Sequence, residues 1–233
     1  MFPREYIPQE NSWYRFYRAL DTVAKYCPRS FGTASAWLDI GCHDGSFLRA
    51  LIQLYGLKAV GCDVYPTEHK EQKAYECFQA TQNENWEYRC LDVSKGIKFE
   101  QQFDAISALE VIEHVIDTDE FLQGAHRHLK NGGLLLLTTP NINNLVNRMR
   151  VPFGWYPIGL EYRNIIHHVR LYNVTTIRQH LHSCGFKVLA IAGVQMLPKR
   201  WFIRVPLLRG LSECLADRLP QLAVNIIVVA QKN

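Results

Sequence analysis

The sequence predicts an α/β fold with a largely parallel sheet, and three observations carry this prediction. Short β-type runs alternate with helical stretches through most of the chain, which is the pattern of strands joined by crossover helices. A glycine-containing turn, Gly41 to Gly45, connects the first buried strand to the next helix. The chain has 233 residues, of which 48% are hydrophobic and 21% are charged, and this profile suits one globular domain.

The expected strands are apolar, β-branched runs bounded by polar or glycine-containing segments. Five are separated by helical stretches and two follow near the C-terminus, which makes seven. They are expected at Ala36–Ile40, Ala59–Asp63, Trp86–Leu91, Ala105–Leu109, Leu134–Thr138, Lys187–Ile191 and Leu222–Lys232.

Three helices are expected between these strands. Residues 46–56 carry a helical apolar face that ends at Gly56. Residues 118–133 open with acidic residues and close around Lys130, which complements the helix dipole at both ends. Residues 175–186 lead into the sixth strand.

The charge of the chain is unevenly distributed. Residues 1–140 hold 14 Lys and Arg against 19 Asp and Glu, whereas residues 141–233 hold 12 against 3. A basic C-terminal third indicates contact with an anionic partner, although a solvated basic surface gives the same pattern.

Targeting and disulfide signals are weak in this sequence. The first 18 residues mix charges with aromatic residues where a secretory signal would need an apolar core. The longest apolar runs fall far short of the roughly 18 residues that a spanning helix needs, so we expect a cytoplasmic protein. The seven cysteines are scattered without a C-x-x-C pair, which predicts neither a disulfide framework nor a zinc ribbon.

The turn in WLDIGCHDGSF, residues 37–47, limits the kind of ligand. A P-loop needs a longer glycine spacing followed by Lys, and Lys is absent. A dinucleotide fingerprint needs three glycines, but His43 and Ser46 occupy the second and third positions. The remaining ligand class contains adenosine without a pyrophosphate.

Acidic residues end the next two strands. Asp63 follows Gly41 by 22 residues, where a carboxylate can accept hydrogen bonds from both ribose hydroxyls. Asp92 ends the third strand, where a carboxylate can reach the adenine amino group. Either acid alone also fits a helix cap or a solvated strand end. Together they predict an adenosine site at the carboxyl ends of neighbouring strands.

These motifs resemble those of the class I S-adenosylmethionine-dependent methyltransferases, especially small-molecule enzymes similar to the ubiquinone-biosynthesis O-methyltransferases. The resemblance is strongest over residues 36–141. It implies a Rossmann-like seven-stranded, mostly parallel sheet with helices on both faces and an antiparallel last strand, and S-adenosyl-L-methionine as cofactor. The cofactor-binding residues that it implies are Asp39, Gly41, His43, Gly45, Asp63, Val64, Asp92, Val93, Leu109, Glu110 and His114.

One position departs from the family pattern. The middle glycine of the D-x-G-x-G-x-G turn is His43 here, and its imidazole could crowd the cofactor. A catalytically silent relative that keeps the fold as a binding or scaffold module is therefore an alternative to the enzyme. A nicotinamide oxidoreductase is a more distant one.

The chain is expected to form a single domain, residues 1–233, because no linker marks a second one. The insertion of about 30 residues after the fifth strand is too long for a plain connection, so it is expected to cover a site. The parts of the domain are an N-terminal helical lid (1–35), a cofactor-binding core (36–140), a substrate cap (141–172) and C-terminal strands (173–233) that include a basic amphipathic insert (197–220).

Methyl transfer from a sulfonium is an in-line displacement with a neutral leaving group, so the protein must align the reactants and remove a proton from a hydroxyl nucleophile. In HHVRLYN, residues 167–173, His168 is the predicted base, although it could instead pin the cap to the main chain. The residues predicted to line the acceptor are Trp155, Tyr156, Tyr162, His167 and Arg170.

The string EVIEHV places Glu110, Glu113 and His114 just after the fourth strand. Quinone-type relatives bind magnesium with an E-x-x-E-H arrangement of this kind. Because the same string occurs in relatives without a metal, we predict a metal-independent site.

The predicted acceptor is a small molecule, either a quinol-like lipid or a sugar of a lipid-linked pathway, methylated at oxygen. The insert 197–220 mixes aromatic and basic residues, which predicts peripheral contact with an anionic inner-membrane surface. Packing of this insert on the core is the alternative. An RNA substrate is disfavoured because the net charge is modest and no RNA-binding module is apparent.

Overall fold

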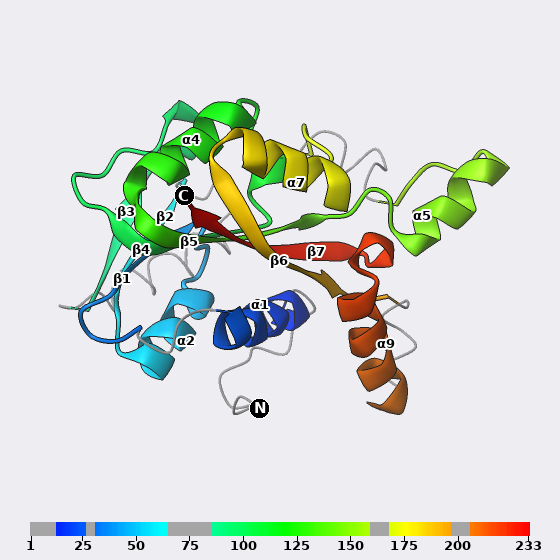
Figure 1. The fold of residues 1–233 in the computed structure, drawn as a ribbon, viewed down its shortest axis with the longest axis horizontal. Coiled ribbons are helices and arrows are strands. Elements are labelled where there is room, and N and C mark those ends of the chain that lie inside the picture. Colours follow the sequence, from blue (N-terminus) through cyan, green and yellow to red (C-terminus); the bar gives the residue numbers. More distant parts are fainter. Residues whose placement is uncertain (1–12, 27–30, 65–84, 159–167, 197–205) are drawn as a thin grey trace.

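The computed structural model describes residues 13–26, 31–64, 85–158, 168–196 and 206–233. These residues form one seven-stranded sheet with helices packed against both faces (Figure 1). The strands are β1 (Ala36–Ile40), β2 (Lys58–Asp63), β3 (Trp86–Cys90), β4 (Phe103–Leu109), β5 (Leu129–Pro140), β6 (Phe186–Val194) and β7 (Asn225–Lys232). The α-helices are α1 (Trp13–Tyr26), α2 (Ser46–Tyr55), α4 (Thr118–His128), α5 (Leu145–Arg150), α7 (Val174–Ser183) and α9 (Pro206–Arg218).

The strand order is β3-β2-β1-β4-β5-β7-β6. β1 to β5 pair with parallel neighbours, and β7 runs antiparallel to both β5 and β6. The predicted mostly parallel sheet with an antiparallel last strand is therefore confirmed. The chain order reverses between β1 and β4, and a parallel sheet binds ligands at the carboxyl ends of its strands beside such a switch point.

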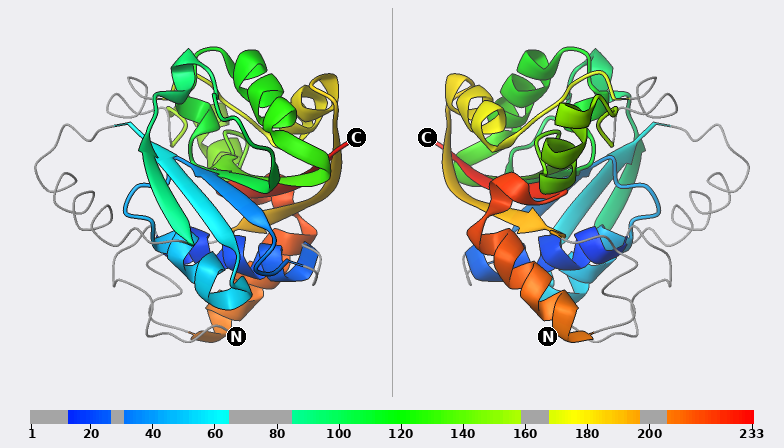
Figure 2. Two further views of the ribbon diagram at one scale, coloured as in Figure 1. Left: turned by 90° about the vertical axis from the view of Figure 1, so that its left-hand side faces the viewer. Right: turned by 90° about the vertical axis from the view of Figure 1, so that its right-hand side faces the viewer.

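The helices form two layers around the sheet. α4 and α7 lie on one face, and α1, α2 and α9 lie on the other (Figures 1 and 2). The run of leucines in β5 serves both layers because side chains alternate along a strand. Leu135 and Leu137 belong to the cluster under α4 and α7, whereas Leu134 and Leu136 belong to the cluster that includes α1 and α2.

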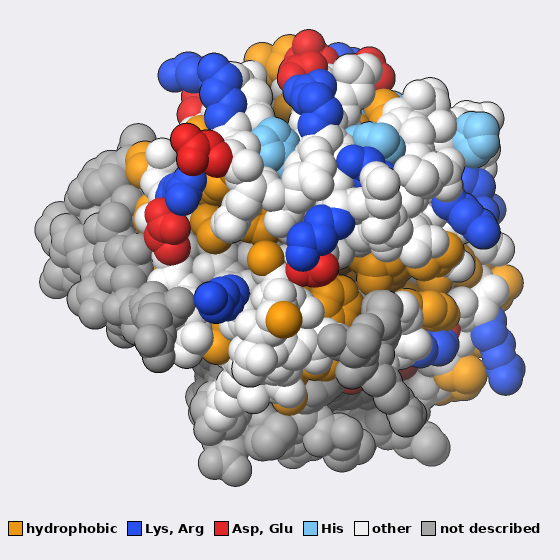
Figure 3. All heavy atoms as spheres, turned by 60° about the vertical axis from the view of Figure 1, so that its left-hand side comes forward, with side chains coloured by type: hydrophobic (Ala, Val, Ile, Leu, Met, Phe, Trp, Pro, Cys, Tyr) orange, Lys and Arg blue, Asp and Glu red, His pale blue; other side chains and the backbone are white. Residues whose placement is uncertain are grey.

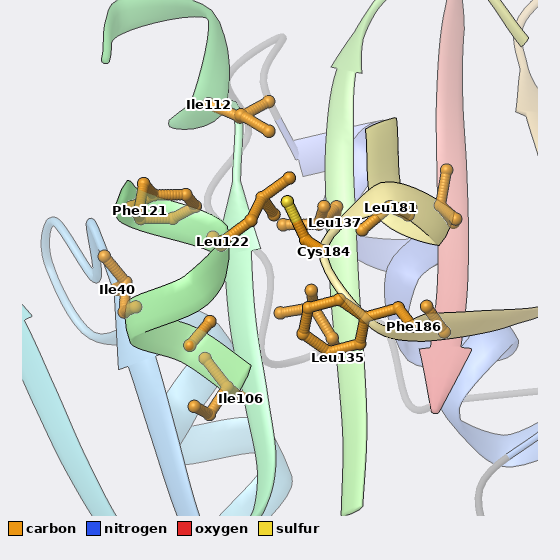
Figure 4. Packing of buried hydrophobic residues seen from close by; sticks show 14 of the residues in the cluster. Ile40, Ile106, Ile112, Phe121, Leu122, Leu135, Leu137, Leu181, Cys184 and Phe186 are labelled. Carbon is orange, nitrogen blue, oxygen red and sulfur yellow. The ribbon is translucent and has the colours of Figure 1, made fainter. Parts of the chain in front are cut away.

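The core under α4 and α7 consists of close-packed apolar side chains (Figure 4). Phe121 and Leu122 from α4 and Leu181 from α7 belong to one buried cluster with Leu135 of β5 and Phe186 of β6. Each of these side chains is at most 1% exposed, and burying one stabilises the fold by about 1.5–3 kcal/mol. This layer holds α4 against β5 and α7 against β6.

Two helix ends agree with the sequence pattern. Gly56 ends α2 in the left-handed conformation (φ 65°), and its N–H bonds to the carbonyl of Ile52. Asn173 caps α7, accepting hydrogen bonds from the amides of Thr175 and Thr176.

The predicted helix over residues 118–133 is too long. α4 ends at His128, and β5 begins at Leu129, which is fully buried and pairs with Phe103. Lys130 does not complement the helix dipole but forms an ion pair with Asp104 of β4 at 2.8 Å. Burial of Leu129 against the sheet outweighs the local helical pattern.

Three observations concern the prediction that the insert, residues 197–220, contacts a membrane surface. No helix among the described residues combines the length and the apolarity needed to cross a bilayer. Lys and Arg stand beside Asp and Glu over much of the described surface on the face in Figure 3. Within the insert, residues 197–205 lie outside the described residues, and α9 buries Ser212 and Ala216. This part of the insert packs on the domain.

Candidate active site

A cavity of about 620 Å³ opens at the carboxyl ends of β1 to β4. This volume lies within the range of about 300–1,000 Å³ that is typical of small-molecule sites. Every residue that was predicted to bind the cofactor lines it, except Asp39 and Gly45. The lining residues are Arg15, Phe16, Gly41, His43, Asp44, Asp63, Val64, Leu91, Asp92, Val93, Ser94, Leu109, Glu110, Val111, His114, Val115 and Thr138.

The turn after β1 brings its main chain to the cavity by adopting the left-handed conformation repeatedly. Gly41 and Gly45 have φ values of 70° and 68°, and His43 between them has a φ of 47°. A Cβ atom on Gly41 would lie 2.5 Å from Cγ2 of Val111. Gly41 is therefore required for both its conformation and its close packing, whereas Gly45 serves as the N-cap of α2.

His43 occupies the position of the missing glycine, and its side chain is 60% exposed at the cavity. A non-glycine residue in this conformation is unusual, although His tolerates it better than most. The imidazole stands in the second of the three glycine positions that the family pattern uses. It lines the cavity without closing it.

Asp63 organises the turn from the end of β2. Its Oδ2 accepts a hydrogen bond from the His43 amide and its Oδ1 accepts one from the Val64 amide, both at 2.8 Å. A carboxylate offers about four acceptor positions, so two remain for a ligand. Burial raises the pKa of this carboxyl above its usual value, and the two amide hydrogen bonds oppose the shift.

Asp92 lies at the end of β3 and caps a short 3-10 turn, Val93–Lys95. Its Oδ1 accepts hydrogen bonds from the Ser94 amide at 3.0 Å and from the Ser94 hydroxyl at 2.6 Å. The Ser94 hydroxyl hydrogen bond holds the pKa of Asp92 below its usual value. The carboxylate is thus held at the cavity wall beside Val93, and it is both a cap and a cavity residue.

Asp39 lies behind the turn and does not line the cavity. It is 2% exposed, and its Oδ1 accepts a hydrogen bond from the Ser107 hydroxyl at 2.5 Å. Ser107 in turn accepts one from the indole N–H of Trp37 at 2.8 Å. Burial raises the pKa of Asp39 to about 7. In this structure Asp39 supports the strand that carries the turn.

Glu110 and α1 close the other side of the cavity. Glu110 has a φ of 59°, and its carboxylate accepts hydrogen bonds from Thr138 and from Asn225, each at 2.9 Å. Arg15 of α1 forms an ion pair with the same carboxylate. Sequence reasoning missed Arg15 and Phe16 because no motif links them to the glycine turn, and only the packing of α1 brings them there.

A second group of titratable residues adjoins the cavity after β4. Glu113 is 2% exposed, and burial together with the Glu110 charge raises its pKa to about 8. The imidazole of His114 lines the cavity and stands edge-on to that of His168, with ring centroids 4.9 Å apart. Ligand atoms of Glu113, His114 and His168 lie within 4.8 Å of one another.

This group differs from the E-x-x-E-H arrangement considered from the sequence. Glu110 points to Arg15, Thr138 and Asn225 and is not part of the group, whereas His168 is. Two imidazoles and one carboxylate can hold a divalent cation, and borderline-soft ions suit such ligands. The sequence does not reveal this group of ligands, because His168 follows Glu113 by 55 residues.

The predicted acceptor residues of the cap lie apart from this cavity where the structure describes them. Trp155 and Tyr156 are 62% and 58% exposed, and neither lines the cavity. Arg170 donates to the carbonyl of Ile116 at 2.8 Å and so ties the end of the cap to the segment that follows His114. Tyr162 and His167 lie outside the described residues.

Comparisons with known proteins agree with this geometry. A family model described as a methyltransferase domain matches residues 12–191. The mitochondrial ubiquinone biosynthesis O-methyltransferase of Homo sapiens is 28% identical over 180 residues, which cover 77% of this chain and 48% of that protein. The chain thus spans about half the length of this and other mammalian relatives it matches.

Solved structures share the fold at low identity. A putative sarcosine dimethylglycine methyltransferase from Galdieria sulphuraria has a TM-score of 0.65 and 15% identity, with 100% of this chain and 92% of that chain covered. Phosphoethanolamine N-methyltransferase 2 of Haemonchus contortus, in complex with S-adenosyl-L-methionine, has a TM-score of 0.60 and 18% identity, with 93% and 52% covered.

The matched family model covers well over half of the chain and includes the glycine turn, Asp63, Asp92 and the acidic turn after β4. The sheet order, the antiparallel last strand and the cavity beside the switch point agree with that match. The chain therefore belongs to the methyltransferase-domain family.

Proposed function

We propose that this chain binds S-adenosyl-L-methionine in the cavity at β1 to β4 and transfers its methyl group to a hydroxyl of a small molecule. The observation that carries the proposal is Asp63, which is fixed by two main-chain amides and keeps acceptor capacity for ribose hydroxyls. The described residues that line the cavity include no lysine, and the turn does not have the glycine spacing of a P-loop.

The residues around the cavity fit the parts of this cofactor. Asp92 and Val93 lie where an adenine edge would approach the end of β3, and Gly41 lines the same cavity from the end of β1. Arg15 supplies a positive charge that suits the methionyl carboxylate, and its partner Glu110 suits the methionyl amino group. When bound, the cofactor supplies an electrophilic methyl group on a sulfonium.

His168 is the proposed base for the acceptor hydroxyl, acting beside His114. An imidazole can take a proton from a hydroxyl at neutral pH. The His168 ring contacts the ring of His114, and His114 lines the cavity. His168 is therefore separated from the cavity by one side chain. His114 can either orient His168 or receive the proton from it.

The proposed acceptor is a quinol-like lipid or a sugar of a lipid-linked pathway. The relatives named ubiquinone biosynthesis O-methyltransferases support the first class. The net positive charge of residues 141–233 supports an anionic or membrane-associated acceptor. Cytoplasmic localisation at an inner-membrane surface is part of the same proposal.

His43 favours one rival, in which the fold is a silent binding module. Calorimetric titration separates the two, with S-adenosyl-L-methionine and S-adenosylhomocysteine as ligands and NAD as control. Micromolar binding of the two sulfur nucleosides with no binding of NAD supports the proposal. Absence of any binding by wild type, and also by His43→Gly, contradicts it.

A further inference from the structure

Asp119, His180 and Cys184 form a cluster of metal-ligating side chains outside the cavity. Asp119 lies in the first turn of α4, and the other two lie at the end of α7. The ligand atoms of the three residues all lie within 4.8 Å of one another. The His180 Nε2 atom is 3.0 Å from Asp119 Oδ1, and the Cys184 Sγ atom is 3.9 Å from it.

These distances are close to those of a zinc site. Tetrahedral Zn²⁺ binds nitrogen and oxygen at about 2.0–2.2 Å and thiolate sulfur at about 2.3 Å, so its ligand atoms lie about 3.3–3.6 Å apart. The distances from Asp119 Oδ1 to His180 Nε2 and to Cys184 Sγ, 3.0 Å and 3.9 Å, lie just below and just above that range. His180 and Cys184 are four residues apart, which brings both side chains to one side of α7. Asp119, with a side chain that is 72% exposed, can adjust to them.

The surroundings of His180 orient its ring. The Tyr172 hydroxyl lies 2.9 Å from Nδ1, which leaves Nε2 facing Asp119. A metal-bound histidine usually donates its other ring N–H to an acceptor of this kind, and this fixes its tautomer. The His180 side chain is only 17% exposed, so this arrangement is held by packing.

Cys184 lies between α4 and α7, next to His180 and Asp119. It is 9% exposed, and it points from the end of α7 toward Leu122 of α4 (Figure 4). The thiol must release its proton to solvent when a metal binds, so metal affinity should rise with pH.

We propose that Asp119, His180 and Cys184 bind a zinc-class divalent cation, with water as the fourth ligand, in a site that ties α4 to α7 and is separate from the cavity. One carboxylate and one thiolate neutralise the charge of the ion. The mixed sulfur, nitrogen and oxygen set suits Zn²⁺ better than Mg²⁺ or Ca²⁺, which prefer oxygen ligands. The site requires no cofactor in the cavity.

Cobalt substitution tests this proposal on the full chain. One equivalent of Co²⁺ is expected to give a thiolate-to-metal charge-transfer band and strong visible bands of a tetrahedral ion, and Zn²⁺ should displace both. Cys184→Ser should abolish the charge-transfer band, His180→Gln and Asp119→Asn should weaken binding, and Tyr172→Phe should weaken it about tenfold. Because the Asp119 side chain is largely exposed, Asp119→Asn should leave the buried core unchanged. It therefore tests metal binding even where another variant unfolds.

Matched controls separate this site from other ligands in the chain. His182→Gln and Cys214→Ser change an exposed histidine on α7 and an exposed cysteine on α9, and both should leave the spectrum unchanged. His168→Gln removes a ligand of the other cluster, which contains no thiol, and should also leave the charge-transfer band unchanged. Wild type without the band, or a band that survives in both Cys184→Ser and His180→Gln, overturns the proposal.

Discussion

The main-chain amide of His43 donates a 2.8 Å hydrogen bond to Oδ2 of Asp63, and so the turn after β1 is tied to the end of β2. The two residues are 20 positions apart in the chain. Asp63 thus has two roles at once, because the carboxylate proposed to bind ribose also holds the glycine turn in its left-handed conformation.

Replacing Asp63 by Ala should therefore weaken binding of S-adenosylhomocysteine by about 10- to 100-fold. Hydrogen bonds to a charged acceptor contribute about 1.5–3 kcal/mol, and each 1.4 kcal/mol is a factor of ten. Calorimetry measures the affinity, and thermal unfolding measures the loss of the turn contacts. Glu120→Ala, at an exposed carboxylate on α4 away from the cavity, should change neither. An Asp63→Ala protein that binds as tightly as wild type contradicts the proposed ribose contact.

Gly41→Ala should lower the free energy of unfolding by about 1–3 kcal/mol, through backbone strain and overpacking. The new Cβ would lie 2.5 Å from Val111 Cγ2 at a φ of 70°. Gly154→Ala is a matched control, because Gly154 has a φ of 75° and no atom within 4 Å of the added Cβ. Denaturant unfolding should show a smaller loss for Gly154→Ala, and Val111→Ala should restore part of the loss at Gly41. Equal losses at both glycines would exclude the clash.

His43→Gly should leave stability within about 1 kcal/mol of wild type, because relief of positive-φ strain is offset by the greater chain entropy of glycine. The variant should bind S-adenosylhomocysteine at least as tightly as wild type, since the main chain becomes more accessible. His43→Val, with a β-branched side chain at the same φ of 47°, should be less stable than both. A tenfold loss of affinity in His43→Gly would instead make the imidazole part of the binding site.

Glu113 should make stability fall as pH rises. Its pKa in the folded protein is about 8, well above the value of about 4.3 for an exposed Glu. Between these values the folded state binds more protons than the unfolded state, so the free energy of unfolding decreases with pH by at most about 1.4 kcal/mol per pH unit from this group.

Urea unfolding from pH 5 to pH 9 measures this slope. Glu113→Gln, which mimics the protonated carboxyl, should flatten it, and Glu120→Gln at the surface should not. A slope that is unchanged by Glu113→Gln would show that other groups cause it. Asp39, with a pKa of about 7, and Asp63, whose pKa burial also raises, contribute to the slope in the same direction.

His168→Gln should lower turnover at neutral pH with little change in affinity for S-adenosylhomocysteine, since His168 does not line the cofactor cavity. The measurement is methyl transfer to a soluble dihydroxyaromatic quinol analogue, with the pH profile of kcat followed from pH 6 to pH 9. His182→Gln is the control for loss of an imidazole at the surface. An unchanged kcat and pH profile would assign proton removal to another group, with His114 the first to examine.

The sequence by itself determined the fold class, the strand that carries the turn and the residues at the strand ends. The alternation of apolar runs with helical faces was sufficient, because each element must bury its apolar side against the same sheet. Asp63 and Asp92 could be placed at one edge from their positions alone, since parallel strands end at the same edge. The resemblance to a methyltransferase followed from those residues.

Tertiary structure decided what no local pattern contains. It brought Arg15 to Glu110, His168 to Glu113 and His114, and Cys184 to Asp119. It also buries Asp39 behind the cavity, and it places the start of β5 at Leu129. Each of these depends on which buried faces meet across the sheet, and packing between elements distant in sequence sets that arrangement.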